Sequence, residues 1–270
     1  MSCWKYWPKI EEIADKLENY GIDEINDLDR VDLDEITSLL DEIEIIAHDE
    51  TIDFDSAKHI LDDEKMNEAL NLIRKFYLYL GARLETSNAI EIIESDDPKA
   101  TLDTFHFYKR YHGLLTNESK LAHWHEDKTF VFVGSGPLPL TLILFRQKFG
   151  CKCIGIEIQE DVAELSREVI KKLGLDDGIE ILVGDETLLK DIDFDILMVA
   201  AFAEPKERVF SNVWEIVDEK TPVLVRTYSG MREILYAPLT DKILRGFHKE
   251  IMLLPIGNSN NTSVLLRKVV

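Results

Sequence analysis

The spacing of hydrophobic residues divides the chain into two parts. Over residues 9–48 apolar side chains recur every three or four positions, which predicts amphipathic helices, and Asp32 stands where a helix N-cap is expected. Residues 56–95 and 99–122 show the same period. We therefore expect residues 1–125 to form an all-helical N-terminal domain.

The pattern changes near residue 129, where short apolar runs begin to alternate with helical patterns. The runs with strand character are 129–134, 151–158, 179–185, 194–201 and 221–227, and the helical patterns between them are 138–149, 160–174 and 205–218. Strands that alternate with helices predict a parallel sheet. Two final runs, 249–256 and 262–269, flank a Gly/Asn-rich turn and predict a hairpin. This combination matches the S-adenosylmethionine (SAM)-dependent methyltransferase variant of the doubly wound, Rossmann-type α/β fold, expected over residues 126–270.

Charge narrows the range of partners. The net charge is −21, and residues 1–125 carry 13 Lys/Arg against 29 Asp/Glu. An acidic surface argues against a nucleic-acid or anionic-membrane partner, because phosphate binding needs a basic face. No apolar run approaches the length of a membrane span. We therefore expect small-molecule partners, and a homodimer stays open as an assembly.

The cysteines indicate the compartment. Cys3, Cys151 and Cys153 are too few, and odd in number, for a disulfide framework, and the N-terminus lacks the apolar core of a secretory signal. These features predict a cytoplasmic protein. Cys151 and Cys153 lack the second pair of ligands that a metal site would need.

The first strand ends in an unusual glycine-containing corner. The segment Gly134-Ser135-Gly136-Pro137-Leu138 is followed by Pro139, where a dinucleotide fold requires its third glycine. Proline suits the first turn of a helix but not a tight approach of the backbone to a pyrophosphate. SAM has no phosphate, so we expect residues 134–138 to bind SAM.

Residues at the ends of the later strands complete this expected cofactor site. Glu157 ends the second strand, where a carboxylate can accept hydrogen bonds from ribose hydroxyls. Asp185 ends the third strand, where such folds contact adenine, and Ala200 ends the fourth. A helix cap at Glu157 and a turn role at Asp185 are the structural alternatives.

The block from Gly134 to Thr141 resembles the nicotianamine synthase family. Leu84-Glu85 resembles the family's Leu–Glu pair at the end of an N-domain helix. Residues 107–111, with Glu118 seven positions further on, resemble its tyrosine-rich segment, and residues 225–230 its fifth-strand arginine and glycine. The plant members of the family have Asp at the position of Glu157. In its short length the chain resembles the archaeal members more than the plant members.

The resemblance implies a reaction. Such proteins move 3-amino-3-carboxypropyl (aminobutanoyl) groups from SAM to an amine, release methylthioadenosine and make nicotianamine-like metallophores. The implied acceptor is glutamate or another SAM-derived unit, and no metal is required for catalysis. A small-molecule SAM methyltransferase and a non-catalytic SAM-binding protein are the alternatives, because fold alone does not determine chemistry.

The attacking amine must lose a proton, so the reaction needs a base. We expect Glu85 to be that base, and Tyr108 and Tyr111, one helical turn apart, to hold the amine or relay its proton. Arg226 is expected to bind a substrate α-carboxylate. Glu85 and Tyr111 are expected to bind the substrate amine. The structural alternatives are core packing for the tyrosines and an ion pair for Arg226.

His123-Trp124-His125 is the remaining motif. Two histidines alone make a poor metal site, so a linker or interface role is expected here.

Overall fold

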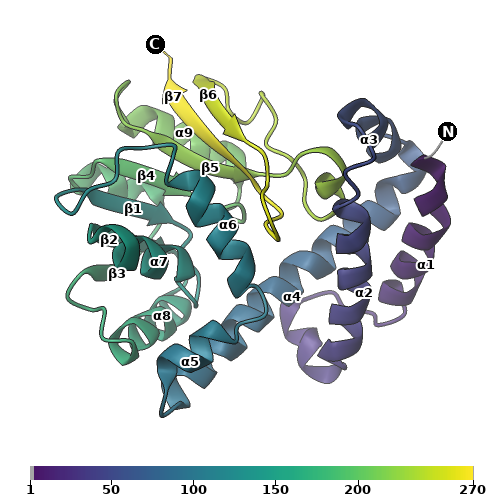
Figure 1. Ribbon diagram of the computed structural model, residues 1–270, viewed down its shortest axis with the longest axis horizontal. Coiled ribbons are helices and arrows are strands. Elements are labelled where there is room, and N and C mark those ends of the chain that lie inside the picture. The colour runs from purple at the N-terminus through teal and green to yellow at the C-terminus, as the bar shows by residue number, and fades with distance from the viewer. Residues whose placement is uncertain (1–2, 270) are drawn as a thin grey trace. The chain divides into compact units, whose positions relative to one another are not determined.

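The computed structural model describes residues 3–269 (Figure 1). Their contacts divide them into two units. The first runs up to Leu84 and includes Tyr228–Pro238; the second comprises Glu85–Thr227 and the chain from Leu239 onward. In this division the expected boundary near residue 125 lies inside the second unit, because residues 85–125 cluster with that unit by their contacts.

The first unit is helical, as the apolar period predicts. Its α-helices are α1 (Trp7–Glu18), α2 (Leu33–Ala47), α3 (Phe54–Leu61) and the first part of α4 (Asn67–Glu94); its 3-10 helices are η1 (Cys3–Tyr6), η2 (Ile25–Arg30), η3 (Glu64–Met66) and η5 (Gly230–Ile234). Asp32 caps α2 as expected, since its carboxylate accepts a hydrogen bond from the backbone N–H of Asp34 at 2.9 Å.

The helices are shorter than the apolar patterns that predict them. Separate helices α3 and α4 occupy residues 56–95, and α5 (Pro98–Asp103) and α6 (Tyr108–Glu118) occupy residues 99–122. Asp97 starts α5 by accepting a hydrogen bond from the N–H of Ala100 at 3.1 Å. Glu85 lies in the interior of α4, a helix of 28 residues, and not at a helix end as the resemblance implied.

The second unit contains a seven-stranded sheet. Its strands are β1 (Thr129–Val133), β2 (Lys152–Glu157), β3 (Ile179–Val183), β4 (Ile196–Val199), β5 (Val223–Thr227), β6 (Phe247–Leu253) and β7 (Thr262–Lys268). Their order is β3-β2-β1-β4-β5-β7-β6. The first five strands are parallel, and β7 runs antiparallel to both β5 and β6. The predicted fold, a SAM-methyltransferase-like sheet with a closing hairpin, is confirmed.

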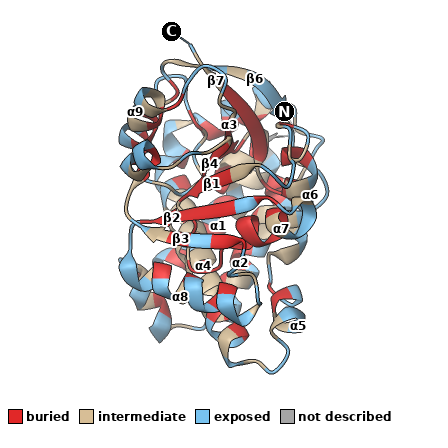
Figure 2. Ribbon diagram, turned by 90° about the vertical axis from the view of Figure 1, so that its left-hand side faces the viewer, coloured by how far each residue is buried: buried red, intermediate tan, exposed pale blue. Residues whose placement is uncertain are grey.

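Helices cover both faces of this sheet. The connecting elements are α7 (Leu140–Phe149), α8 (Glu160–Lys172), η4 (Glu186–Asp191) and α9 (Lys206–Ile216). Figure 1 shows α9 on the opposite side of the sheet from α6 and α7. Figure 2 shows that the central strands are largely buried, whereas the outer sides of α8 and α9 are exposed. The buried strands explain why their sequences read as apolar runs without alternation.

The strand order also predicts where a ligand binds. The chain leaves β1 toward β2 on one side, and after β3 it crosses β1 to form β4 on the other side. Such a switch point opens a crevice at the carboxyl ends of the strands. The segment that follows β1 there is the Gly134–Leu138 corner.

Two isoleucines on α2 test the packing of the first unit. Ile43 is fully buried and Ile45 is 73% exposed. Both changes replace Ile by Ala on one helix, so they differ in burial alone. Ile43→Ala is expected to cost about 2–5 kcal/mol of unfolding free energy, and Ile45→Ala less than about 1 kcal/mol. Urea denaturation followed by circular dichroism measures both; equal losses would contradict the packing described.

Candidate active site

Two glycines shape the corner after β1. Gly134 has φ +80° and Gly136 has φ +70°, a left-handed conformation that other residues rarely adopt. A Cβ on Gly134 would come within 3.1 Å of the Ala200 Cβ and 3.4 Å of the Ala203 Cβ. The corner and the end of β4 can therefore approach closely only because residue 134 has no side chain. Ala200 thus lies beside the corner, and a cofactor contact by this residue stays a prediction.

Two carboxylates converge on Gly136. Its N–H donates to Glu157 Oε2 at 3.0 Å, and the N–H of Gln159 donates to Glu157 Oε1 at 3.1 Å. A Cβ on Gly136 would lie 3.3 Å from Glu85 Oε2. The structure therefore brings Glu85 of α4 and Glu157 of β2 to one backbone turn, although 72 positions separate them in the chain.

The Glu85 carboxyl group has the properties of a base that works near neutral pH. Burial raises its pKa to about 7, and the negative charge of Glu157 adds to this effect. The Tyr111 hydroxyl, which donates to Glu85 Oε1 at 3.3 Å, and the positive charge of Arg226 act in the opposite direction. An acceptor with a pKa close to the working pH is effective in general base catalysis.

The two predicted tyrosines have different surroundings. Burial, reinforced by the charge of Glu85, raises the pKa of Tyr111, so this phenol stays protonated and able to donate. Burial together with a hydrogen bond to Asp103 raises the pKa of Tyr108 to about 12. The Tyr108 ring packs edge-on against His112, with centroids 5.0 Å apart. The structure brings Tyr111, but not Tyr108, to Glu85, and a catalytic role for Tyr108 stays a prediction.

Arg226, at the end of β5, forms a buried ion pair with Glu118. Its Nε lies 2.6 Å from Glu118 Oε1 and its Nη2 lies 2.8 Å from Oε2, with both residues at most 7% exposed. The guanidinium carbon also lies 5.5 Å from the centroid of the Tyr111 ring. The ion pair, which was the structural alternative for Arg226 in the sequence, is thus present. A substrate contact by Arg226 stays a prediction.

Asp185 occupies the end of β3, where it caps η4. Its carboxylate accepts hydrogen bonds from the N–H, at 3.0 Å, and from the hydroxyl of Thr187, and these bonds hold its pKa below the usual range. The predicted turn role is therefore present. An adenine contact by this residue stays a prediction.

Sequence reasoning missed an apolar rim at the same edge of the sheet. Ile158 follows β2 and is 56% exposed, Val183 ends β3 and is 38% exposed, and Phe202 follows β4 and is 39% exposed. Exposed apolar groups next to polar ones are typical of ligand sites. The sequence signal that could have identified them is their position at, or within three residues after, the end of a strand.

The model of the nicotianamine synthase protein family matches residues 10–270. The chain belongs to the nicotianamine synthase family.

Solved and curated family relatives agree with this assignment. The crystal structure of MtNAS in complex with MTA and tNA is 52% identical, with a TM-score of 0.93 and 98% coverage of both chains. Nicotianamine synthase of Solanum lycopersicum is 24% identical, with coverage of 77% of this chain and 71% of the relative. L-histidine 2-aminobutanoyltransferase of Yersinia pestis is 23% identical over 133 residues, which span 49% of this chain and 50% of that protein.

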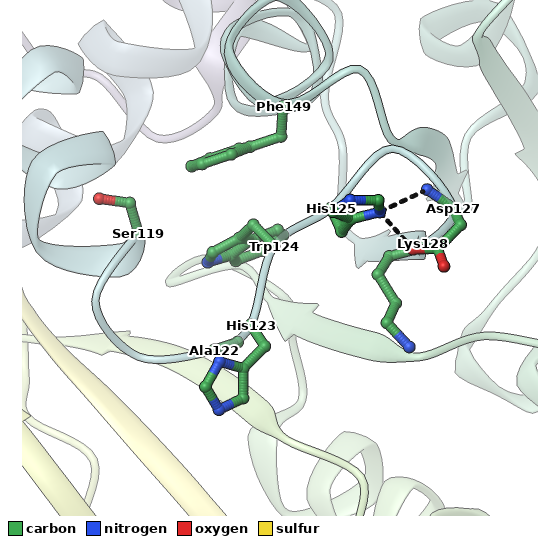
Figure 3. Close-up of a pocket in the computed structure, with 8 residues that line it drawn as sticks. All are labelled: Ser119, Ala122, His123, Trp124, His125, Asp127, Lys128 and Phe149. Atoms are coloured by element: carbon green, nitrogen blue, oxygen red, sulfur yellow. Dashed lines mark hydrogen bonds and ion pairs between the residues drawn. The ribbon is translucent and has the colours of Figure 1, made fainter.

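The histidine motif of this family member borders a separate hollow of about 620 Å³ in the segment between α6 and β1 (Figure 3). His125 Nδ1 lies 2.8 Å from Asp127 Oδ1, and Trp124 stacks on Phe149 with ring centroids 5.4 Å apart. Within residues 3–269, no group of three or more His, Cys, Asp or Glu side chains is placed to hold a metal ion.

The raised pKa of Glu85 predicts a pH dependence of stability. In the folded state this carboxyl binds its proton up to a pH of about 7, against an ordinary value of 4.5. Its contribution to stability is therefore complete below pH 4.5 and is lost as the pH rises through 7. The unfolding free energy should fall over this window more in the wild type than in Glu85→Gln, as measured by urea denaturation at several pH values. Parallel curves for the two proteins would contradict the raised pKa.

Proposed function

We propose that this protein transfers 3-amino-3-carboxypropyl groups from SAM to the amine of an amino acid, releases methylthioadenosine and makes a metal-chelating, nicotianamine-like product. The observation that carries the proposal is the meeting of Glu85 with the Gly136 corner, in a chain whose family match covers residues 10–270. A base next to a cofactor corner is what an amine-alkylating enzyme requires.

The residues at the corner fit SAM. Ser135 Oγ is buried and has no hydrogen-bond partner among the described residues, so it is ready to bond a polar ligand group. Glu157 can accept further hydrogen bonds from ribose hydroxyls, since a carboxylate has about four acceptor positions. The exposed Ile158 and Val183 side chains offer apolar contact to an adenine ring.

When bound, SAM supplies a sulfonium-activated carbon and a neutral thioether leaving group. No general acid is needed for such a leaving group, but the ammonium group of the acceptor must be deprotonated. In the proposal, Glu85 takes this proton at its carboxylate, and Tyr111 holds the carboxylate through its hydroxyl. Which carbon is attacked depends on which one is held in line with the amine.

The relatives support this choice of reaction. Structures of MtNAS contain MTA and tNA, and a Glu-to-Gln variant of MtNAS at 51% identity contains S-adenosylmethionine. Three curated relatives are named L-histidine 2-aminobutanoyltransferase. For this chain we propose glutamate or another SAM-derived amino acid as the acceptor.

We further propose residues 126–270 as the cofactor-binding domain and residues 1–125 as the helical domain that selects the acceptor. The cytoplasm is the proposed location, supported by the free thiols of Cys151 and Cys153. Among the described residues, no helix is both long and apolar enough to cross a membrane.

The product separates this proposal from its alternatives. Incubation of the purified protein with SAM, with and without glutamate or histidine, is expected to yield methylthioadenosine, detected by mass spectrometry. Accumulation of S-adenosylhomocysteine would instead indicate a methyltransferase. Unchanged SAM after long incubation would indicate a binding protein. The Glu85→Gln variant should keep its SAM affinity and lose turnover by roughly 100-fold or more, whereas Glu91→Gln, an exposed glutamate of the same helix, should keep both.

Gly136→Ala tests the corner itself. The added Cβ would stand 3.3 Å from Glu85 Oε2 in a backbone conformation with φ +70°, so both the turn and the carboxylate must shift. We expect SAM affinity to fall by roughly tenfold or more, consistent with a strain of about 1–3 kcal/mol. Isothermal titration calorimetry measures this, with Gly81→Ala as the control because nothing lies within 4 Å of that position. Unchanged affinity in Gly136→Ala would contradict the proposed site.

A further inference from the structure

The Glu118–Arg226 ion pair has no part in the mechanism above, although it lies beside the groups that do. Glu118 is 1% exposed and Arg226 is 7% exposed. A buried ion pair is weak evidence for stability, because desolvation of the two charges offsets their attraction. The position of the pair therefore suggests a role in the reaction, and the following inference rests on the proposed function.

Glu118 and Tyr111 share one face of α6. They are seven positions apart, which is two helical turns, so both side chains point the same way. Arg226 of β5 lies against both, with two short bonds to the Glu118 carboxylate and its guanidinium carbon 5.5 Å from the Tyr111 ring centroid. This distance is within the range of a cation–π contact. The guanidinium therefore connects the Glu118 carboxylate to the Tyr111 ring.

We propose that Glu118 is a positioning residue for the transfer reaction: its two-bonded pair with Arg226 fixes the guanidinium against Tyr111 and so holds the Tyr111 hydroxyl on the Glu85 carboxylate. In this arrangement Glu118 also neutralises the charge of Arg226. Glu118 touches neither substrate nor cofactor in the proposal, and acts through Arg226 and Tyr111.

The charges around Glu85 determine the sign of the expected effect. Three groups act on Glu85 directly: Tyr111 on α6, Glu157 on β2 and Arg226 on β5. Glu118 on α6 acts on Glu85 through its ion pair with Arg226. Removal of the Glu118 charge leaves Arg226 uncompensated, which favours the ionised carboxylate of Glu85 and lowers its pKa. Removal of both charges takes away the influence of Arg226 and raises that pKa. A buried ion pair remote from Glu85 would not produce these shifts of opposite sign.

The test is the pH dependence of kcat/KM for methylthioadenosine formation in four proteins. These are the wild type, Glu118→Gln, the double variant Glu118→Gln/Arg226→Gln, and Glu186→Gln. Glu186 is the matched control because it is also 1% exposed and paired with an arginine, Arg208, at 3.2 Å. The acid limb is expected to move down by roughly one pH unit in Glu118→Gln, to move above the wild-type position in the double variant, and to stay in place in Glu186→Gln.

Loss of Tyr111 alignment should also lower kcat while leaving KM for SAM within about twofold. An acid limb that stays at the wild-type pH in both Glu118 variants would overturn the inference, as would equal shifts in Glu186→Gln. If Glu118→Gln does not fold, the double variant still tests the inference, because it buries no unpaired charge. The acid limb of its kcat/KM profile must then lie at a higher pH than that of the wild type. A wild type that forms no methylthioadenosine would instead contradict the proposed function itself.

Discussion

The approach of two carboxylates to Gly136 is the constraint on which the candidate site depends. The Gly136 N–H binds Glu157 at 3.0 Å, and Glu85 Oε2 lies 3.3 Å from the point where a Cβ would stand. A larger residue would strain the turn at φ +70° and displace Glu85. The proposed base can therefore lie this close to the proposed cofactor corner only because residue 136 is a glycine.

A second constraint is the distribution of charge around this turn. Two carboxylates, those of Glu85 and Glu118, lie near the guanidinium of Arg226, and a third, that of Glu157, lies near Glu85. If Arg226 paired directly with Glu85, it would hold the pKa of that carboxyl low and make it a poor base. Because Arg226 bonds Glu118 instead, burial dominates at Glu85 and its pKa lies at about 7.

The sheet could be predicted from the sequence more completely than the helices. Strands buried on both faces are continuous apolar runs between turn residues, so the runs at 129–134 and 151–158 correspond to β1 and β2 within two residues. A helical period does not show where one helix stops and the next begins. The breaks near Leu61 and Phe107 therefore went unpredicted, because capping and tertiary contacts set them.

The site shows the same difference between local and long-range information. Glu157 could be placed at the corner from sequence, because the carboxyl ends of parallel strands meet at one edge of a sheet. Resemblance alone pointed to Glu85, since a glutamate inside a long helix has no local signature. The pairing of Glu118 with Arg226 joins residues 108 positions apart and depends on how α6 packs against α7 and β7. From sequence, Arg226 had two interpretations, a substrate contact or an ion pair, and only its three-dimensional neighbours show that its charge already has a partner.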